Sequence, residues 1–137
     1  MIQIITGQAG TGKTKQLLSI ANEKARIQKG HVVYIDSTTK HRYDLSHHVR
    51  LIEATTFPIT SPHDFFGFLC GILSSNHDVE LVLIDELVKI THLSINDLTH
   101  FVEKLKNLSE KYHVDFIIGA TCSTKDLPEN LLPYLVA

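Results

Sequence analysis

The segment from Gly7 to Thr14 is the feature that most constrains how this chain can fold. It reads Gly-Gln-Ala-Gly-Thr-Gly-Lys-Thr, a complete G-x-x-x-x-G-K-[ST] pattern, and it follows directly on an apolar run at residues 2–5. This arrangement is typical of a strand, a glycine-rich loop and the first turn of a helix. Backbone N–H groups can approach a phosphate closely where glycines carry no side chain. The pattern predicts a phosphate-binding loop made of Gly7, Gln8, Ala9, Gly10, Thr11, Gly12, Lys13, Thr14 and Lys15.

Two side chains at the end of this loop have predicted chemical roles. We expect the ammonium group of Lys13 to reach the β and γ phosphates of a nucleoside triphosphate, which makes Lys13 a candidate catalytic residue. The hydroxyl group of Thr14 is a candidate ligand for the Mg²⁺ ion that bridges those phosphates. The N-terminus of the following helix would add its dipole and its unpaired N–H groups. ATP and Mg²⁺ are the predicted cofactors.

Length and composition limit the classes of protein that this chain can belong to. With 137 residues, 43% of them hydrophobic, the chain can bury one core, and we expect a single domain over residues 1–137. The formal net charge is -2, and basic residues are not concentrated beyond short pairs, so there is no strong nucleic-acid signal. No apolar stretch approaches the ~18 residues that span a bilayer, which predicts a cytoplasmic protein. Cys70 and Cys122 are isolated and are expected to be buried free thiols, and no histidine is given a role.

Apolar runs alternate with amphipathic segments along the chain. Helices are predicted at residues 13–29, with Gly30 at the C-terminal cap, at residues 62–73 after an N-cap at Ser61, and after the Ser94 to Asp97 capping pattern. The last of these should bury Leu98, Phe101, Val102, Leu105 and Leu108. Strands are predicted at residues 2–5, 31–35, 49–54, 79–84 and 114–119, followed by a tail. This order predicts an α/β protein, a three-layer α/β/α sandwich with a mostly parallel five-stranded sheet.

Polar residues follow several of the predicted strands, at the sheet edge where ligands of such folds bind. Asp85 and Glu86 end the apolar run at residues 81–84, and Asp36 and Thr121 end two other strands. Asp85 is a candidate ligand for Mg²⁺, together with Thr14. Glu86 is a candidate catalytic base that orients and deprotonates an attacking water or hydroxyl group.

These two motifs together give the chain a family resemblance. It resembles P-loop NTPases of the additional-strand, RecA-like type, which include the core of secretion and twitching-motility ATPases, with residues 7–14 as Walker A motif and 81–86 as Walker B motif. The resemblance implies that the strand at residues 114–119 lies between the two motif strands. It also implies a polar sensor residue at the end of that strand, either Thr121 or Ser123.

The chain is also similar, more distantly, to the core of type II thymidine kinases. The similarity rests on the phosphate loop, on Asp36 with the later pair Arg42 and Tyr43, and on the strand ending in Asp85-Glu86. Those kinases carry a cysteine-bound zinc segment and a closing nucleoside loop, and this sequence has neither.

Three functions remain open on the sequence alone. The first is Mg²⁺-dependent ATP binding with slow hydrolysis that a protein partner or self-association stimulates, because rapid hydrolysis needs a cation at the developing charge. Of the three arginines, Arg42 and Arg50 could supply that cation in trans, whereas Arg26 lies in the first helix. The second is a small-molecule or nucleoside kinase with its acceptor near residues 36–49. The third is a nucleotide-bound interaction module without turnover.

Overall fold

A computed structural model describes residues 1–8 and 10–136 and contains a five-stranded sheet in which every pairing is parallel. The strands are β1 (Ile2–Gly7), β2 (His31–Asp36), β3 (Val49–Glu53), β4 (Val79–Ile84) and β5 (Asp115–Thr121). Their order in the sheet is β1-β5-β4-β2-β3. β5 therefore lies between the strand that precedes the glycine loop and the strand that ends in Asp85-Glu86, as the resemblance implied.

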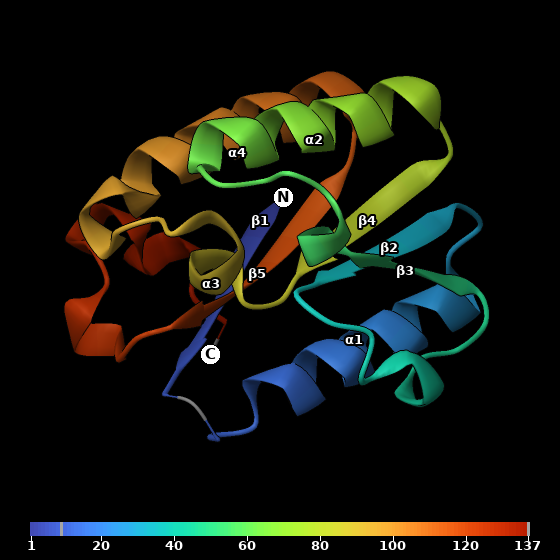
Figure 1. The fold of residues 1–137 in the computed structure, drawn as a ribbon, viewed down its shortest axis with the longest axis horizontal. Coiled ribbons are helices and arrows are strands. Elements are labelled where there is room, and N and C mark those ends of the chain that lie inside the picture. Colours follow the sequence, from blue (N-terminus) through green and yellow to red (C-terminus); the bar gives the residue numbers. More distant parts are fainter. Residues whose placement is uncertain (9, 137) are drawn as a thin grey trace.

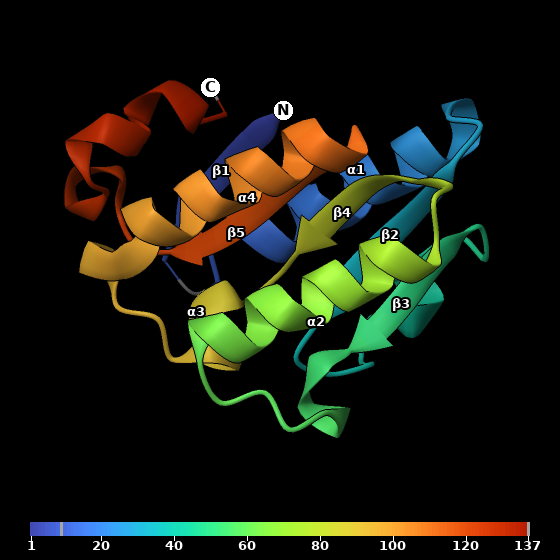
Figure 2. The same ribbon diagram turned by 90° about the horizontal axis from the view of Figure 1, so that it is seen from above.

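Helices cover both faces of this sheet and complete the predicted three-layer sandwich. They are α1 (Lys13–Ile27), α2 (Pro62–Ser75), α3 (Leu87–Thr91) and α4 (Leu98–Tyr112). Figure 1 shows α1 on one face, and α2, α3 and α4 on the other. In Figure 2, α2 and α4 run side by side across the sheet, where the rings of Phe65 and Phe101 stack at 6.2 Å between centroids.

The period of two along each buried strand divides the core into two clusters. On β4, Val82 and Ile84 belong to the larger cluster with α2 and α4, whereas Leu81 and Leu83 belong to the smaller cluster with α1. Both faces of this strand are buried, which explains the continuous apolar run in its sequence. The parallel register brings the carboxyl ends of β1, β5, β4 and β2 to one edge, because Gly7 pairs with Thr121 and Ile84 pairs with both Ile118 and Ile35.

The two predicted capping patterns both form, with one difference. The Ser61 hydroxyl accepts a hydrogen bond of 3.0 Å from the Asp64 N–H group and caps α2. The Ser94 hydroxyl accepts from the Asp97 N–H group, but it caps a single 3₁₀ turn (Ile95–Asp97), and α4 begins only at Leu98. All the positions predicted to face inward from α4 are buried: Leu98, Phe101, Val102, Leu105 and Leu108.

The predicted end of the first helix was wrong. α1 ends at Ile27, and its C-cap is Gln28 in an extended conformation, so Gly30 does not cap it. Gly30 instead lies where β2 begins beside β4, and a Cβ atom there would come within 2.5 Å of the Asp78 carbonyl oxygen. The neighbouring His31 N–H group donates to that same carbonyl at 2.7 Å. A close approach of two backbones, and not a helix cap, accounts for this glycine.

The remaining differences concern short elements. β3 ends at Glu53 and β5 is shifted to Asp115–Thr121, while α3 had no counterpart in the prediction. The expected tail forms 3₁₀ turns, and its Val136 N–H group donates to the Ile4 carbonyl at 3.0 Å beside β1. Cys122 is buried as expected, but Cys70 is only half-buried. None of the helices in the described residues is long and apolar enough to cross a membrane.

Candidate functional site

The glycine loop begins where β1 ends, at the carboxyl edge of the sheet. The Gly7 N–H group donates to the Cys122 carbonyl at 3.0 Å and holds the start of the loop beside the end of β5. A Cβ atom on Gly7 would lie 2.4 Å from the Thr11 hydroxyl oxygen, so only glycine fits there without displacing the loop. The Gln8 carbonyl accepts from both the N–H group and the hydroxyl of Thr11, at 3.2 and 2.6 Å. Ala9 lies outside the described residues.

Two further glycines turn the loop into α1. Gly10 and Gly12 have φ angles of 84° and 94°, in the left-handed region that other L-residues rarely adopt. Gly12 is the N-cap of α1 and provides no side-chain acceptor, so the helix start keeps N–H groups for a ligand. Thr14 and Lys15 lie in this first turn, half-buried and exposed respectively.

A cavity of about 630 Å³ lies over the loop and the first turns of α1. Its lining combines the loop and α1 with the connection between β2 and β3: Gly10, Gly12, Lys13, Thr14, Lys15, Leu18, Lys40, His41 and Asp44. Lys13 is only 9% exposed. None of the ion pairs among the described residues involves Lys13, Lys15 or Lys40, so their positive charge is available to an anion.

Asp85 directly follows β4, and one of its carboxylate oxygens accepts a hydrogen bond while the other has no partner among the described residues. The residue is 1% exposed, and the Tyr34 hydroxyl donates to Oδ2 at 3.0 Å. Burial and the Asp85 carboxylate raise the pKa of the Tyr34 phenol above its usual value, so the phenol stays a donor. Asp85 Oδ1 is buried and has no hydrogen-bond partner among the described residues. An orphaned anionic oxygen in a protein interior requires an explanation, and a cation is one.

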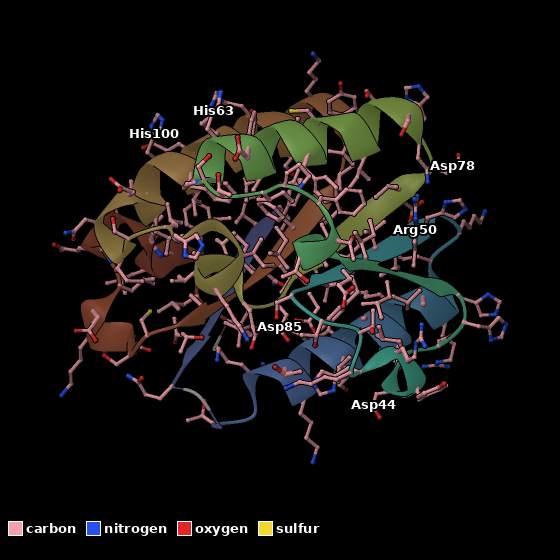
Figure 3. All side chains as sticks on the ribbon, in the orientation of Figure 1. Asp44, Arg50, His63, Asp78, Asp85 and His100 are labelled. Carbon is pink, nitrogen blue, oxygen red and sulfur yellow. The ribbon has the colours of Figure 1, made fainter. Side chains whose placement is uncertain are left out.

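The surroundings of Asp85 Oδ1 show which way it faces. A Cβ atom on Gly119, in β5, would lie 3.5 Å from Asp85 Oδ1 and 2.9 Å from Leu17 Cδ1. Leu17 is one helical turn after Thr14, on the same side of α1. Figure 3 shows Asp85 at the carboxyl edge of the sheet, on the side that α1 covers. A carboxylate oxygen and a threonine hydroxyl are hard oxygen ligands, and the pair fits Mg²⁺, whose other ligands are usually water and phosphate.

Gly119 permits this close packing of α1 on the sheet, and a substitution should reveal it. We expect Gly119→Ala to lower the free energy of unfolding by about 1–3 kcal/mol, because Leu17 is fully buried and cannot move aside freely. Gly67→Ala is the matched control, since a Cβ atom there meets nothing within 4 Å in α2 and should stabilise the helix by about 0.5–1 kcal/mol. Urea denaturation measures both. Equal effects of the two substitutions would contradict the packing argument.

Glu86 is held next to Asp85 in a different environment. Its backbone is left-handed, with φ of 58°, and it precedes α3. The Ser37 hydroxyl, at the end of β2, donates to Glu86 Oε2, and the Lys89 ammonium lies 3.7 Å from the same oxygen. The Glu86 side chain remains 33% exposed, so water can reach a carboxylate whose orientation the fold has fixed.

Asp36 is a third carboxylate at this edge of the sheet. It is 2% exposed, and the Ser37 N–H group donates to its Oδ1 at 2.6 Å. Burial, and secondarily the charge of Asp85, raise the pKa of Asp36 to about 6. The folded protein therefore holds a proton on Asp36 at pH values where the unfolded chain has released it.

This proton predicts a pH-dependent stability. Because the folded pKa of Asp36 is raised, its contribution to stability is complete below pH 4 and is lost as the pH rises to about 6. We expect Asp36→Asn, which keeps an acceptor for the Ser37 N–H group, to stabilise the fold by about 1–3 kcal/mol at pH 7.5 and to have little effect at pH 4. Denaturation at both pH values tests this, with the exposed Glu110→Gln as control. The same pH dependence in Asp36→Asn and in the parent would refute it.

Neither the predicted sensor residues nor the arginines are among the described residues that line the cavity over the loop. Thr121 ends β5, is exposed, and pairs in register with Gly7 at the start of the loop. The Ser123 hydroxyl instead donates to the Asp126 carboxylate at 3.0 Å. Within the described part of the chain, no arginine lines the cavity over the loop: Arg42 and Arg50 line other cavities, and Arg26 pairs with Glu23.

Sequence reasoning did not single out five polar residues of this site. They are Tyr34, which holds Asp85, Ser37, which holds Glu86, and Lys40, His41 and Asp44, which line the cavity. Tyr34 lay inside an apolar strand, although a buried tyrosine hydroxyl calls for a polar partner. The kinase alternative placed an acceptor near residues 36–49, but no local pattern singled out Lys40 or His41 within that segment, because only the path of the chain after β2 brings them to the loop.

The fold and this edge of the sheet define a P-loop NTPase-type domain. Comparison with protein families agrees: a family model described as AAA domain matches residues 1–108. The chain belongs to the AAA domain family, which indicates nucleotide-binding, ATPase-like activity. No curated protein matches the sequence.

Proposed function

We propose that this protein binds ATP together with Mg²⁺ and hydrolyses it slowly on its own. The observation that carries the proposal is the buried, unsatisfied Asp85 Oδ1 on the side of the sheet that α1 covers. Without a cation this oxygen would destabilise the fold, whereas a magnesium ion held jointly by Asp85 and Thr14 would satisfy it. Mg²⁺ would neutralise charge on the β and γ phosphates.

The residues of the site divide the remaining work. The N–H groups of the loop and the ammonium group of Lys13 bind the phosphates. Glu86 orients a water molecule and accepts its proton as the water oxygen bonds to the γ phosphorus. The bond from that phosphorus to the bridging oxygen breaks, ADP leaves with the electron pair, and Glu86 passes the proton to solvent. Thr121 is the proposed polar sensor residue of this hydrolysis reaction.

Turnover should be slow without a partner. An arginine at the developing charge contributes ~10³ to 10⁵ in rate, and no arginine among the described residues lines the cavity. A protein partner or a second copy of this chain could supply one. We therefore propose a nucleotide-controlled switch, in which the bound nucleotide governs contact with that partner.

Titration calorimetry tests the binding step directly. The parent protein should bind ATP with Mg²⁺ and bind it more weakly when EDTA removes the metal, and the same titration with GTP measures the preference for the base. An absence of Mg²⁺-dependent binding of either nucleotide would overturn the proposal.

A small-molecule kinase is the second candidate, and the extent of the cavity favours it. The cavity reaches from the phosphate loop to Lys40, His41 and Asp44, which leaves room for an acceptor beyond the phosphates. Glu86 would then deprotonate an acceptor hydroxyl instead of water. Release of ADP across a panel of nucleosides and other small hydroxyl compounds separates the two. Stimulation by one small acceptor favours the kinase, and stimulation by protein alone favours the switch.

A further inference from the structure

The connection between β2 and β3 is held by hydrogen bonds at both of its ends, to the site at its start and to α1 at its far end. At its start, Ser37 donates to Glu86, and the Ser37 carbonyl accepts from the Thr55 hydroxyl at 2.6 Å. At its far end, the Asn22 side chain of α1 donates to the Asp44 carbonyl at 2.8 Å and accepts from the Ser46 N–H group at 2.7 Å. The connection is thereby held beside α1, and its residues Lys40, His41 and Asp44 line the cavity over the phosphate loop.

Between these anchors the connection presents one cationic side chain to the cavity and another away from it. Lys40 lines the cavity over the phosphate loop, together with His41, whose ring lies 3.1 Å from the Asp44 carboxylate. Arg42, two residues further, lines a separate cavity beside β3, and its guanidinium lies 5.8 Å from the centre of the Tyr43 ring. In Figure 3, Asp44 lies beside α1, on the same side of the sheet as Asp85.

The position of this connection indicates which part of a bound nucleotide Lys40 could contact, namely the terminal phosphate. β2 is the neighbour of β4, so the segment after β2 lies on the side of the loop that carries Asp85 and Glu86. Those two residues face the metal and the terminal phosphate in the function proposed above. We expect a cation on this side of the loop to contact the terminal phosphate of a bound triphosphate. A diphosphate lacks that group and carries less negative charge there.

We propose that Lys40 binds the terminal phosphate of the nucleotide and so makes the β2–β3 connection responsive to whether ATP or ADP is bound. This inference rests on the proposed function. Lys40 adds a positive charge to the cavity from the side of the β2–β3 connection. Loss of the terminal phosphate removes the ligand of Lys40 and loosens the connection between its two anchors. Tyr43 lies on the same connection, three residues after Lys40. It is 90% exposed, the highest value among the large hydrophobic residues that the structure describes.

The test compares a nonhydrolysable ATP analogue with ADP, both with Mg²⁺, by titration calorimetry. We expect Lys40→Ala to weaken binding of the analogue about tenfold and to leave ADP binding unchanged, because one charged hydrogen bond is lost. Lys29→Ala is the matched control, with the same charge removed beyond the far end of α1, and should leave both affinities unchanged. Lys40→Arg retains the charge and should keep the preference for the analogue.

Each outcome bears on a different statement. The role of Lys40 at the terminal phosphate is overturned in either of two cases, provided that the parent binds both ligands. Lys40→Ala binds each ligand as tightly as the parent does, or it loses affinity for both ligands to the same extent. The proposed function stands in both cases. If Lys29→Ala reproduces the selective loss, the effect is one of surface charge and the assignment to Lys40 fails. If the parent binds neither ligand, the proposed function itself fails and this inference fails with it.

Discussion

Replacing Lys13 with alanine is expected to weaken the binding of ATP with Mg²⁺ by about 100-fold or more. Lys13 is 9% exposed and lines the cavity at the end of the glycine loop. Its ammonium group lies in a partly dehydrated position, where an interaction with phosphate is stronger than at an open surface. Hydrolysis should fall further than binding, by about 10² to 10³ at saturating ATP, because the charge on the phosphates changes in the transition state.

The fold of the Lys13→Ala variant should survive the substitution. Lys13 takes part in none of the ion pairs among the described residues, so its removal leaves no charged partner buried alone. Calorimetry and thermal unfolding on the same samples separate the two effects. Lys29→Ala, beyond the opposite end of α1, is the matched control and should bind ATP as the parent does. Parent-like binding by Lys13→Ala would contradict the assignment of the phosphate loop.

Glu86→Gln is expected to have the opposite profile, with binding retained and turnover lost. Glutamine keeps the size of the side chain and an acceptor for the Ser37 hydroxyl, but it cannot take a proton from water. We expect single-turnover hydrolysis to fall by about 10² to 10⁴, while ATP affinity stays within a few-fold of the parent. The difference between the Lys13→Ala and Glu86→Gln variants would distinguish nucleotide binding from nucleotide hydrolysis.

Single-turnover measurement with labelled ATP checks this expectation, and the exposed Glu110→Gln in α4 is the control. A measurable parent rate that Glu86→Gln leaves unchanged would remove Glu86 from the mechanism. Equal and negligible rates in the parent and in Glu86→Gln would leave a nucleotide-bound interaction module as the function of this protein.

Much of the fold was predictable from local sequence. A continuous apolar run predicted the strand β4. Five apolar positions at helical spacing predicted α4, and all five are buried. The order of the two motif strands with β5 between them followed from the resemblance, and the sheet confirms it. The end of α1 was missed because a close approach between chain segments at Gly30 has the same local signature as a helix cap. The short helix α3 was also missed.

The sequence by itself determined the elements and the phosphate loop, because strand and helix periods, glycines and capping residues act over a few neighbouring positions. Only the tertiary structure decided what surrounds that loop. Parallel crossovers bring together residues that are far apart in the chain, so Tyr34 meets Asp85 and Ser37 meets Glu86. The same crossovers bury Asp36 and raise its pKa, and they carry Lys40 to the cavity. These contacts depend on distance in space, which no local pattern encodes.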